Sequence, residues 1–324
     1  MLDSVLGSVE MSSLEAGEAK MLTGVLRSTY NSPQDMDFLQ SAAEFGRHLP
    51  DTLRNSLRQF RYAESPAAVL VSGYPVEEEN LGPTPAHWNL HSGETTRDLD
   101  FWLMVVCAQL GEPFGWSFLQ NGRIITDVLP IKEKEQEQSG HASLAHQYLH
   151  NEDAFHECRA DYVALTCLRN SGIPTTVSPV TTDGLTAGEV DTLFEPRFEI
   201  RADLEHSAGL GESQSQVVSA LHGDRERPYS RIDPPFMSAL PGDAAAQKAL
   251  DTLFADLESR AVEVSLEPGD VLIVDNYRAV HGRRGFPARY DGADRWLRRT
   301  TLTRDLRKSR TFRRSSADRI IQRA

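Results

Sequence analysis

Two histidines and one carboxylate in this sequence have the types and the spacing of a metal centre. His150 and Glu152 lie two apart in the stretch 147–156, and an extended strand projects such residues from one face. His281 lies far downstream, shortly after 269–276, a stretch typical of a turn that leads into a buried strand. Two histidines and one carboxylate on one face of a metal leave open coordination positions, an arrangement that suits non-haem Fe(II). The sequence therefore predicts that His150, Glu152 and His281 are metal ligands and catalytic.

A zinc site on a helix is the alternative. His146 and His150 are four apart, so a helix through them would turn both imidazoles to one side. The glutamate that usually follows the first histidine of such a motif is absent. We therefore interpret His146 and His156 as structural or solvent-facing.

Two arginines downstream of His281 could hold an anionic cosubstrate. Three protein ligands leave positions for a chelating cosubstrate and O2, and arginine binds a second carboxylate in a bidentate manner. On a strand, Arg295 and Arg299 share one face, and Trp296 and Arg298 share the other. Without the metal ligands, the same arginines would indicate a solvated basic edge.

Composition limits the class of partner. The 324 residues are 40% hydrophobic and 25% charged, which is ordinary for a globular protein, and the net charge of −13 argues against nucleic acid. Residues 278–324 carry fifteen Lys or Arg against four Asp or Glu, which suits small anionic ligands and pairing with the acidic body. Cys107, Cys158 and Cys167 indicate reduced thiols. With neither a signal peptide nor an apolar run of membrane length, we expect a soluble, cytoplasmic protein with no membrane partner.

The order of the predicted elements indicates the fold class. Helices are predicted at 12–27, 31–45, 50–60 and 97–110, and again at 186–194 and 244–263. Apolar or alternating runs predict strands at 67–74, 115–122, 124–129, 147–156, 162–168, 175–178, 271–276 and 295–302. Residues 205–229 mix Gly, Ser, Gln and charge, which favours a lid. The order predicts a mainly β (α+β) protein with an antiparallel barrel or jelly roll buttressed by helices.

Four short motifs in combination resemble a known family. They are 120–123 (QNGR), 150–156 (HNEDAFH), 168–170 (LRN) and 294–297 (DRWL). They are similar to the clavaminate synthase-like Fe(II)/2-oxoglutarate oxygenases, in the branch that hydroxylates free arginine, asparagine or lysine in antibiotic pathways. The resemblance covers residues 65–305. It implies a double-stranded β-helix (jelly-roll, cupin-like) core, with Fe(II), 2-oxoglutarate and O2 as cofactor and cosubstrates.

The resemblance also implies residue roles. Iron would be held by His150, Glu152 and His281, and Glu152 would also contact the substrate. Arg295, fourteen residues after His281, would hold the far carboxylate of 2-oxoglutarate, with help from Thr176. Arg299 would bind the α-carboxylate of the substrate, and Gln120 its α-amine.

Asp233 is the candidate for substrate choice. It falls where relatives place an acid against the substrate side chain, so it would receive an ammonium or guanidinium group and reject neutral analogues. The alternative is an ion pair with Arg231 or Arg227. Arginine hydroxylases of the family use two such aspartates and this chain shows one, which favours lysine first and arginine second.

Two positions bear on the family pattern. Asn151 replaces a threonine that is frequent between the first two ligands, a change that we expect not to affect ligation. Glu152 is retained, whereas related halogenases lack this carboxylate, so hydroxylation is favoured.

The sequence thus predicts one catalytic domain, 1–324. Residues 1–64 form its helical part, 65–305 its core with the lid at about 205–229, and 306–324 a basic tail. The predicted reaction is hydroxylation at C3 or C4 of a free basic L-amino acid, with succinate and CO2 as coproducts. The alternative function is a non-catalytic or zinc-binding jelly-roll protein that binds an amino acid. The oligomeric state stays open.

Overall fold

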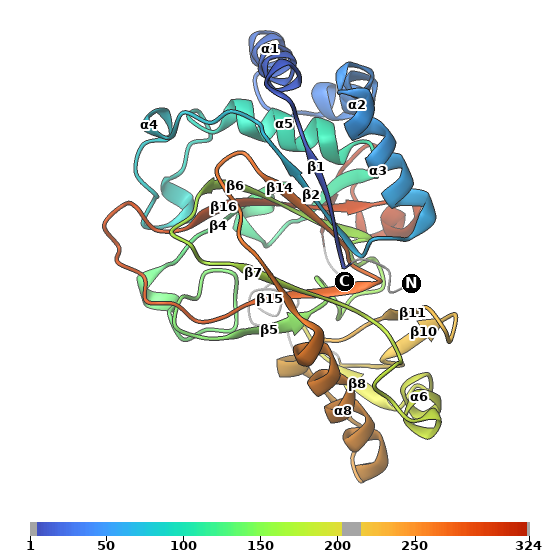
Figure 1. Ribbon diagram of the computed structural model, residues 1–324. Helices are drawn as coiled ribbons and strands as arrows, with labels where there is room; N and C mark the ends of the chain where they lie inside the picture. The colour runs from blue at the N-terminus through green and yellow to red at the C-terminus, as the bar shows by residue number, and fades with distance from the viewer. Residues whose placement is uncertain (1–4, 203–214, 323–324) are drawn as a thin grey trace.

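Two layers of mainly antiparallel sheet packed face to face form the centre of the molecule (Figure 1). The computed structural model describes residues 5–202 and 215–322. The larger sheet has the order β1 (Leu6–Glu10), β2 (Ala68–Ser72), β14 (Val271–Asp275), β6 (Tyr162–Arg169), β16 (Trp296–Thr303), β3 (Glu112–Trp116) and β17 (Ile320–Ile321), with β4 (Ile125–Val128) also paired to β16. The smaller sheet has the order β13 (Val262–Val264), β7 (Thr175–Pro179), β15 (Ala279–Arg283) and β5 (Gln147–His150). This architecture confirms the predicted jelly-roll core.

The central strands are apolar on both faces because both faces are covered. In β14, Leu272 and Val274 belong to the cluster between the two sheets, where they meet Val177 of β7. Val271 and Ile273 point the other way, into the cluster beneath the helices. The two-residue period of a strand therefore explains why this run reads as continuously hydrophobic.

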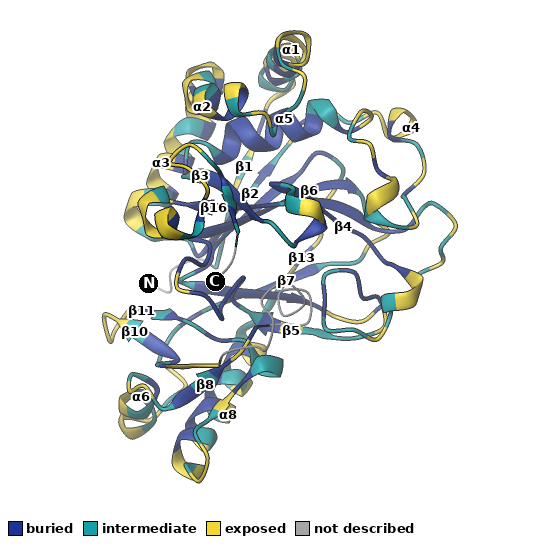
Figure 2. Cartoon of the chain, turned by 180° about the vertical axis from the view of Figure 1, so that it is seen from behind, coloured by how far each residue is buried: buried dark blue, intermediate teal, exposed yellow. Residues whose placement is uncertain are grey.

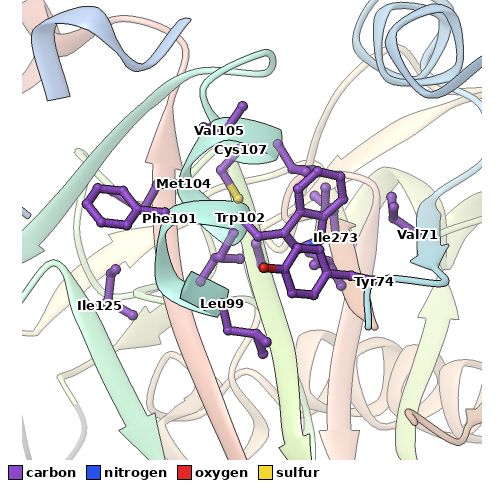
Figure 3. Close-up of a cluster of buried hydrophobic side chains, with 14 of the residues drawn as sticks. Val71, Tyr74, Leu99, Phe101, Trp102, Met104, Val105, Cys107, Ile125 and Ile273 are labelled. Carbon is purple, nitrogen blue, oxygen red and sulfur yellow. The ribbon is translucent and has the colours of Figure 1, made fainter. Parts of the chain in front are cut away.

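Helices from the first third of the chain cover the outer face of the larger sheet (Figures 1 and 2). They are α1 (Ser13–Thr29), α2 (Met36–Phe45), α3 (Asp51–Ala63) and α5 (Arg97–Cys107). A capping box begins α1 at the predicted residue, because the side chains of Ser12 and Glu15 accept hydrogen bonds from each other's backbone N–H groups. Helix α5 is buried along its length from Leu99 onward, and its Trp102 stacks on Tyr74 with ring centroids 5.1 Å apart (Figure 3).

A second, smaller layer lies against the outer face of the smaller sheet. It contains α6 (Ala187–Leu193), α8 (Ala244–Arg260), the three strands β8 (Phe198–Ile200), β9 (Gln216–Val218) and β12 (Met237–Ala239), and the hairpin β10 (Leu221–Gly223) and β11 (Pro228–Ser230). Leu250, Leu253 and Leu257 of α8 are buried in this layer. In the described part of the chain, every helix is too short or too polar to cross a bilayer.

Short helical turns complete the description. They are η1 (Gly46–His48), α4 (Glu78–Leu81), η2 (Trp88–Leu90), η3 (Gln120–Gly122), η4 (Lys132–Lys134), η5 (Pro234–Phe236) and η6 (Leu306–Phe312).

One segment differs from its prediction. Residues 203–214, where the predicted lid begins, lie outside the described residues, but the remainder of the predicted lid is not a loop, because β9, β10 and β11 occupy it. The basic tail, in its described part 306–322, packs on the body. Its β17 pairs with β3, and Arg313 and Arg319 are buried at 5% and 6% exposure. Whether residues 1–324 act as one catalytic domain stays a prediction.

Candidate metal centre and substrate cleft

The register of two strands in the smaller sheet brings the two histidines together. Strand β15 pairs antiparallel with β5 so that His281 lies directly opposite His150, and paired residues share a face. The ring centroids are 4.6 Å apart. Strand β5 ends at His150, so the prediction that Glu152 continues the strand is wrong: Glu152 lies in the turn that follows. The turn nevertheless brings its Oε2 to 3.4 Å from His281 Nε2 and 4.0 Å from His150 Nε2.

The ligand atoms of these three residues fit one metal ion. They all lie within 4.8 Å of one another, and ligands about 2.1 Å from one metal at right angles stand about 3 Å apart. Nδ1 of His150 lies 2.8 Å from Tyr148 O, which fixes the tautomer whose Nε2 carries a free lone pair. Within the described residues, the buried Oε2 of Glu152 accepts no hydrogen bond. A buried carboxylate oxygen left in this way fits a metal ligand.

Electrostatics keep the donors in the protonation states that a metal requires. Burial, followed by the neighbouring His281, lowers the pKa of His150 to about 4. Burial raises the pKa of Glu152, but the Arg299 guanidinium and the imidazoles of His281 and His150 outweigh it and hold that pKa well below its ordinary value. His150 is therefore neutral and Glu152 ionised at neutral pH.

The helical zinc alternative is wrong. Gln147 to His150 form a strand, so His146 and His150 do not share a helical face. The side chain of His146 lies 3.7 Å from Glu258 Oε1, at the partly exposed surface.

The arginines of β16 take the faces that the strand period predicts. Arg299 Nη1 donates to Glu152 Oε1 at 2.6 Å, on the metal side. Arg298, on the other face, is bound by two buried carboxylates, Asp100 at 2.9 Å and Asp127 at 2.7 Å. Trp296 also points to that face, because its Nε1 donates to Asp127 at 2.8 Å.

Arg295 is a buried cation without an acidic partner among the described residues. Its exposed fraction is 5%, its Nη2 donates to Thr175 Oγ1 at 2.9 Å, and its buried Nε donates to no atom of the described chain. Burial, and then repulsion from Arg283, lower the pKa of Arg295 to about 9. A guanidinium held in this way suits a carboxylate that comes from outside the chain, and it excludes the solvated basic edge.

Thr175, which the sequence interpretation passed over, lies on the metal side of β7. Val177 is paired with His281, and Thr175 shares the face of Val177 because it is two residues away. Thr176 shares the opposite face with Ser178, whose Oγ donates to Leu257 O of α8 at 2.7 Å. The strand was predicted correctly, but its facing depends on the partner strand.

An open cleft adjoins the metal ligands. His150, Glu152, Arg299 and Asp233 line it, together with Gln138, Ser139, Gly140, Gln147, Tyr148, Pro235 and Phe236. Arg231, one of the two proposed partners of Asp233, sends its guanidinium elsewhere, to Ala154 O at 2.6 Å and Phe155 O at 2.9 Å. The structure thus brings Asp233 and Arg299 to one cleft beside the metal ligands.

Gln120 is buried and is not part of the lining of this cleft. Its Nε2 donates to Asp127 O at 2.8 Å and lies 3.3 Å from His141 Nε2, and its Oε1 accepts from Asp127 N at 2.9 Å. An amide oxygen has two lone pairs, so Oε1 keeps one for a further donor.

Asn276 is a second residue that the sequence interpretation missed. It lies in the turn between β14 and β15, accepts from Glu152 N at 2.7 Å and donates to Glu152 O at 2.9 Å. Its amide therefore fixes the backbone of the carboxylate ligand. No sequence pattern around it signals this role.

Comparison with known proteins identifies the family. Residues 192–301, which include His281 and both arginines, match the model described as taurine catabolism dioxygenase TauD, TfdA family. An L-ornithine/L-arginine 3-hydroxylase of Catenulispora acidiphila is 38% identical, in an alignment that covers 91% of this chain and 94% of the relative. This chain belongs to the TauD/TfdA family of dioxygenases.

Further TauD/TfdA relatives agree. An enduracididine beta-hydroxylase of Streptomyces hygroscopicus is 38% identical over 91% of this chain and 94% of its own length. The crystal structure of the non-heme iron oxygenase OrfP with Fe and alpha-ketoglutaric acid has a TM-score of 0.90 at 38% identity, covering 97% of this chain and 99% of OrfP. Clavaminate synthase 2 of Streptomyces clavuligerus is 29% identical over 83% of this chain, which confirms the resemblance drawn from the motifs.

Membership confirms the predicted enzyme class. The protein is an Fe(II)/2-oxoglutarate-dependent amino-acid hydroxylase, with O2 as the second cosubstrate. The donor set at His150, Glu152 and His281 fits the iron of this class.

Proposed function

We propose that this enzyme hydroxylates C3 of a free, arginine-like L-amino acid. The observation that carries the proposal is the cleft in which Arg299 and Asp233 lie together beside His150 and Glu152. A cation to receive the α-carboxylate and an acid to receive the side-chain cation are the two groups that a basic amino acid requires. When bound, Fe(II) with 2-oxoglutarate and O2 supplies the oxidant that inserts one oxygen atom into a C–H bond, giving succinate and CO2.

We assign the residue roles from their positions. His150, Glu152 and His281 hold the iron, with Glu152 also at the substrate cleft. Arg295 and Thr175 hold the far carboxylate of 2-oxoglutarate, because their hydrogen bond places a buried cation and a hydroxyl side by side. Thr176, on the opposite face of β7, has no part in this assignment.

Three residues are predicted to bind the substrate. Arg299 binds the α-carboxylate and Asp233 the guanidinium, so both ends of the molecule are held beside the metal ligands. Gln120 keeps its predicted role toward the α-amine through the remaining lone pair of its Oε1.

The relatives favour arginine over the lysine preferred from the sequence. A relative at 38% identity is named an L-ornithine/L-arginine 3-hydroxylase. OrfP has been crystallised with (3S)-hydroxy-L-Arg, and that structure matches this chain with a TM-score of 0.91. Both names point to C3 in those proteins. The presence of one aspartate, Asp233, is weaker support for lysine than these two similarities are for arginine.

The test is turnover with a panel of amino acids. Protein loaded anaerobically with Fe(II) and 2-oxoglutarate is exposed to air with each free L-amino acid, and succinate and a one-oxygen mass gain are measured. We expect succinate and oxidised product with arginine, ornithine or lysine. The His150→Ala and Glu152→Ala variants should form neither, although circular dichroism should show that they are folded. Asp233→Asn should raise the KM for arginine about 100-fold, because the guanidinium loses its charged partner.

Other outcomes would revise the proposal. Preferred oxidation of a neutral amino acid would keep the enzyme class and remove the role of Asp233. Amino-acid binding without any oxidation, unchanged in His150→Ala, would favour the non-catalytic alternative.

A further inference from the structure

Asn151, between the two metal ligands of one turn, is fully buried and uses every hydrogen-bonding position of its side chain. Its Oδ1 accepts from Ser230 Oγ and from Ile232 N, each at 3.0 Å. Its Nδ2 donates to Asn276 O at 2.9 Å and to Ala279 O at 3.0 Å. A primary amide has two acceptor and two donor positions, and all four are filled. Its exposed fraction is 0%, so bulk solvent does not reach this side chain.

The backbone strengthens the same connection. Asn151 N donates to Ile232 O at 2.9 Å, so the two residues exchange hydrogen bonds in both directions. Arg231 adds its bonds to the carbonyls of Ala154 and Phe155 in the turn after Glu152. The segment 230–232 is therefore tied along its length to the turn that carries the carboxylate ligand.

This arrangement joins three parts of the site through one side chain. Asn151 is flanked by His150 and Glu152, Ala279 precedes His281 by two residues on β15, and Ile232 directly precedes Asp233. A displacement of segment 230–232 is thus passed to Asp233 on one side and to the metal turn on the other. The amide thus joins segments that are distant in the chain, because Asn151 and Ser230 are 79 positions apart.

We propose that Asn151 is a positioning residue that sets the distance between Asp233 and the metal centre, and thereby selects the substrate carbon that is attacked. The proposal rests on the proposed function, in which Asp233 holds the far end of the substrate. Neighbouring carbons of the substrate are about 1.5 Å apart, so a shift of that size exchanges C3 for C4. Misplacement by about 1 Å lowers the rate about 100-fold in well-oriented sites.

A hydroxyl side chain cannot take the place of this amide. Threonine, the residue that the resemblance associates with this position, has one donor and so cannot serve both Asn276 O and Ala279 O. The presence of asparagine in place of threonine, which we expect not to affect metal ligation, therefore affects how the substrate is aligned.

The test uses two variants of the linkage and a matched control. Asn151→Ala removes all four side-chain bonds. Ser230→Ala removes one of these four, together with the longer contact of Ser230 Oγ with Tyr277 O at 3.4 Å, and keeps the protein testable if the first variant does not fold. Ser178→Ala is the control, since it also deletes a buried hydroxyl with a backbone partner, Leu257 O, but does so on the face of β7 that points to α8.

Two readouts are measured. In the metal-free protein, hydrogen exchange of peptides that cover 228–236 should be about tenfold faster in Asn151→Ala than in wild type, because Ile232 N–H loses its acceptor. In the Fe(II)-loaded protein with 2-oxoglutarate and arginine, the yield of hydroxylated product per succinate should fall about tenfold in Asn151→Ala and less in Ser230→Ala. A second regioisomer should appear in both variants, and Ser178→Ala should match wild type in both readouts.

The outcomes separate this proposal from the one on which it rests. If both variants attack the same carbon with the same yield per succinate as Ser178→Ala, the role of Asn151 is overturned and the proposed function stands. If the wild type oxidises no basic amino acid, the proposed function fails and the role of Asn151 fails with it.

Discussion

Two buried arginines three residues apart show how partners decide what a charge does. Arg298 is surrounded by Asp100 and Asp127, and although burial lowers its pKa, these carboxylates raise it above its ordinary value. Arg295 has a threonine hydroxyl instead of an acid, so burial leaves its pKa lowered to about 9. Arg298 therefore stabilises the folded protein, whereas Arg295 lowers its stability and is available to bind a ligand.

Replacing each arginine by methionine should separate these two roles. Arg298→Met leaves two carboxylates buried together and should lower the free energy of unfolding by about 3–5 kcal/mol. Arg295→Met removes an unpaired buried cation, so the ligand-free protein should be as stable as wild type or more stable, while the KM for 2-oxoglutarate rises about 100-fold. Chemical denaturation and succinate formation measure the two effects. Equal loss of stability in both variants would contradict the assignment.

The sequence predicted side chains whose position follows from their own strand. The alternation of Arg295, Trp296, Arg298 and Arg299 could be read directly, because the period of a strand is a local property. Thr175 could not be chosen over Thr176, since which face of β7 looks inward depends on its pairing with β15. Asn151 was undervalued for the same reason, because its partners are distant in the chain.

At the scale of elements, the turn between β14 and β15 connects the core to the metal centre. Asp275 ends β14, and its Oδ1 accepts from Tyr277 N at 3.0 Å and from Arg278 N at 3.3 Å. Burial raises the pKa of Asp275 to about 6, and Glu64 contributes in the same direction. The carboxylate of Asp275 therefore fixes the turn, although its burial makes the ionised form unfavourable in the folded protein.

Asp275→Asn should stabilise the protein at neutral pH. The folded-state pKa of about 6 lies above the ordinary 3.8, so the folded state binds the proton more tightly, and the stability gained from protonation is complete below pH ~4 and lost as the pH rises through 6. An asparagine oxygen accepts the same two bonds without charge. We expect about 1–3 kcal/mol of added unfolding free energy at pH 7.5, shrinking toward pH 4.5. A pH-independent difference in denaturation experiments would contradict this explanation.

Elements with strong local signals were predicted, and short ones were missed. The capping box at Ser12 and the apolar run of α5 predicted their helices. Strands β1, β9 and β17 have two to five residues and little alternation, so only their partners make them strands. In the same way, the lid prediction followed polar composition and overlooked the pairing of β9, β10 and β11 in its described part.

For the whole molecule, the metal centre lies on a scaffold that is held together without it. The sheets are joined by an apolar cluster in which Leu165, Leu272 and Val177 are buried, and the ligands lie on backbone fixed by strand pairing and by the asparagine amides. This differs from small domains that fold only around a metal.

Removal of metal should therefore leave the fold intact. After chelation, far-UV circular dichroism should be unchanged and the thermal midpoint should fall only by the linkage of the lost ion, and added Fe(II) should restore activity. Loss of the circular dichroism signal on chelation would show that the ion is structural. Magnesium-matched buffer serves as the control for ionic effects.

The pairing of His150 with His281 has a consequence for how such enzymes diverge. One bulge, between His281 and Arg283, already takes up an extra residue of β5 and leaves His281 opposite His150. An insertion without such a bulge would turn one imidazole to the far side of the sheet. The connection from β7 to β13 contains helices, hairpins and turns whose length does not enter that register. Evolution can therefore rebuild the walls of the cleft for a new amino acid by insertion and deletion, while the oxidising chemistry is inherited unaltered.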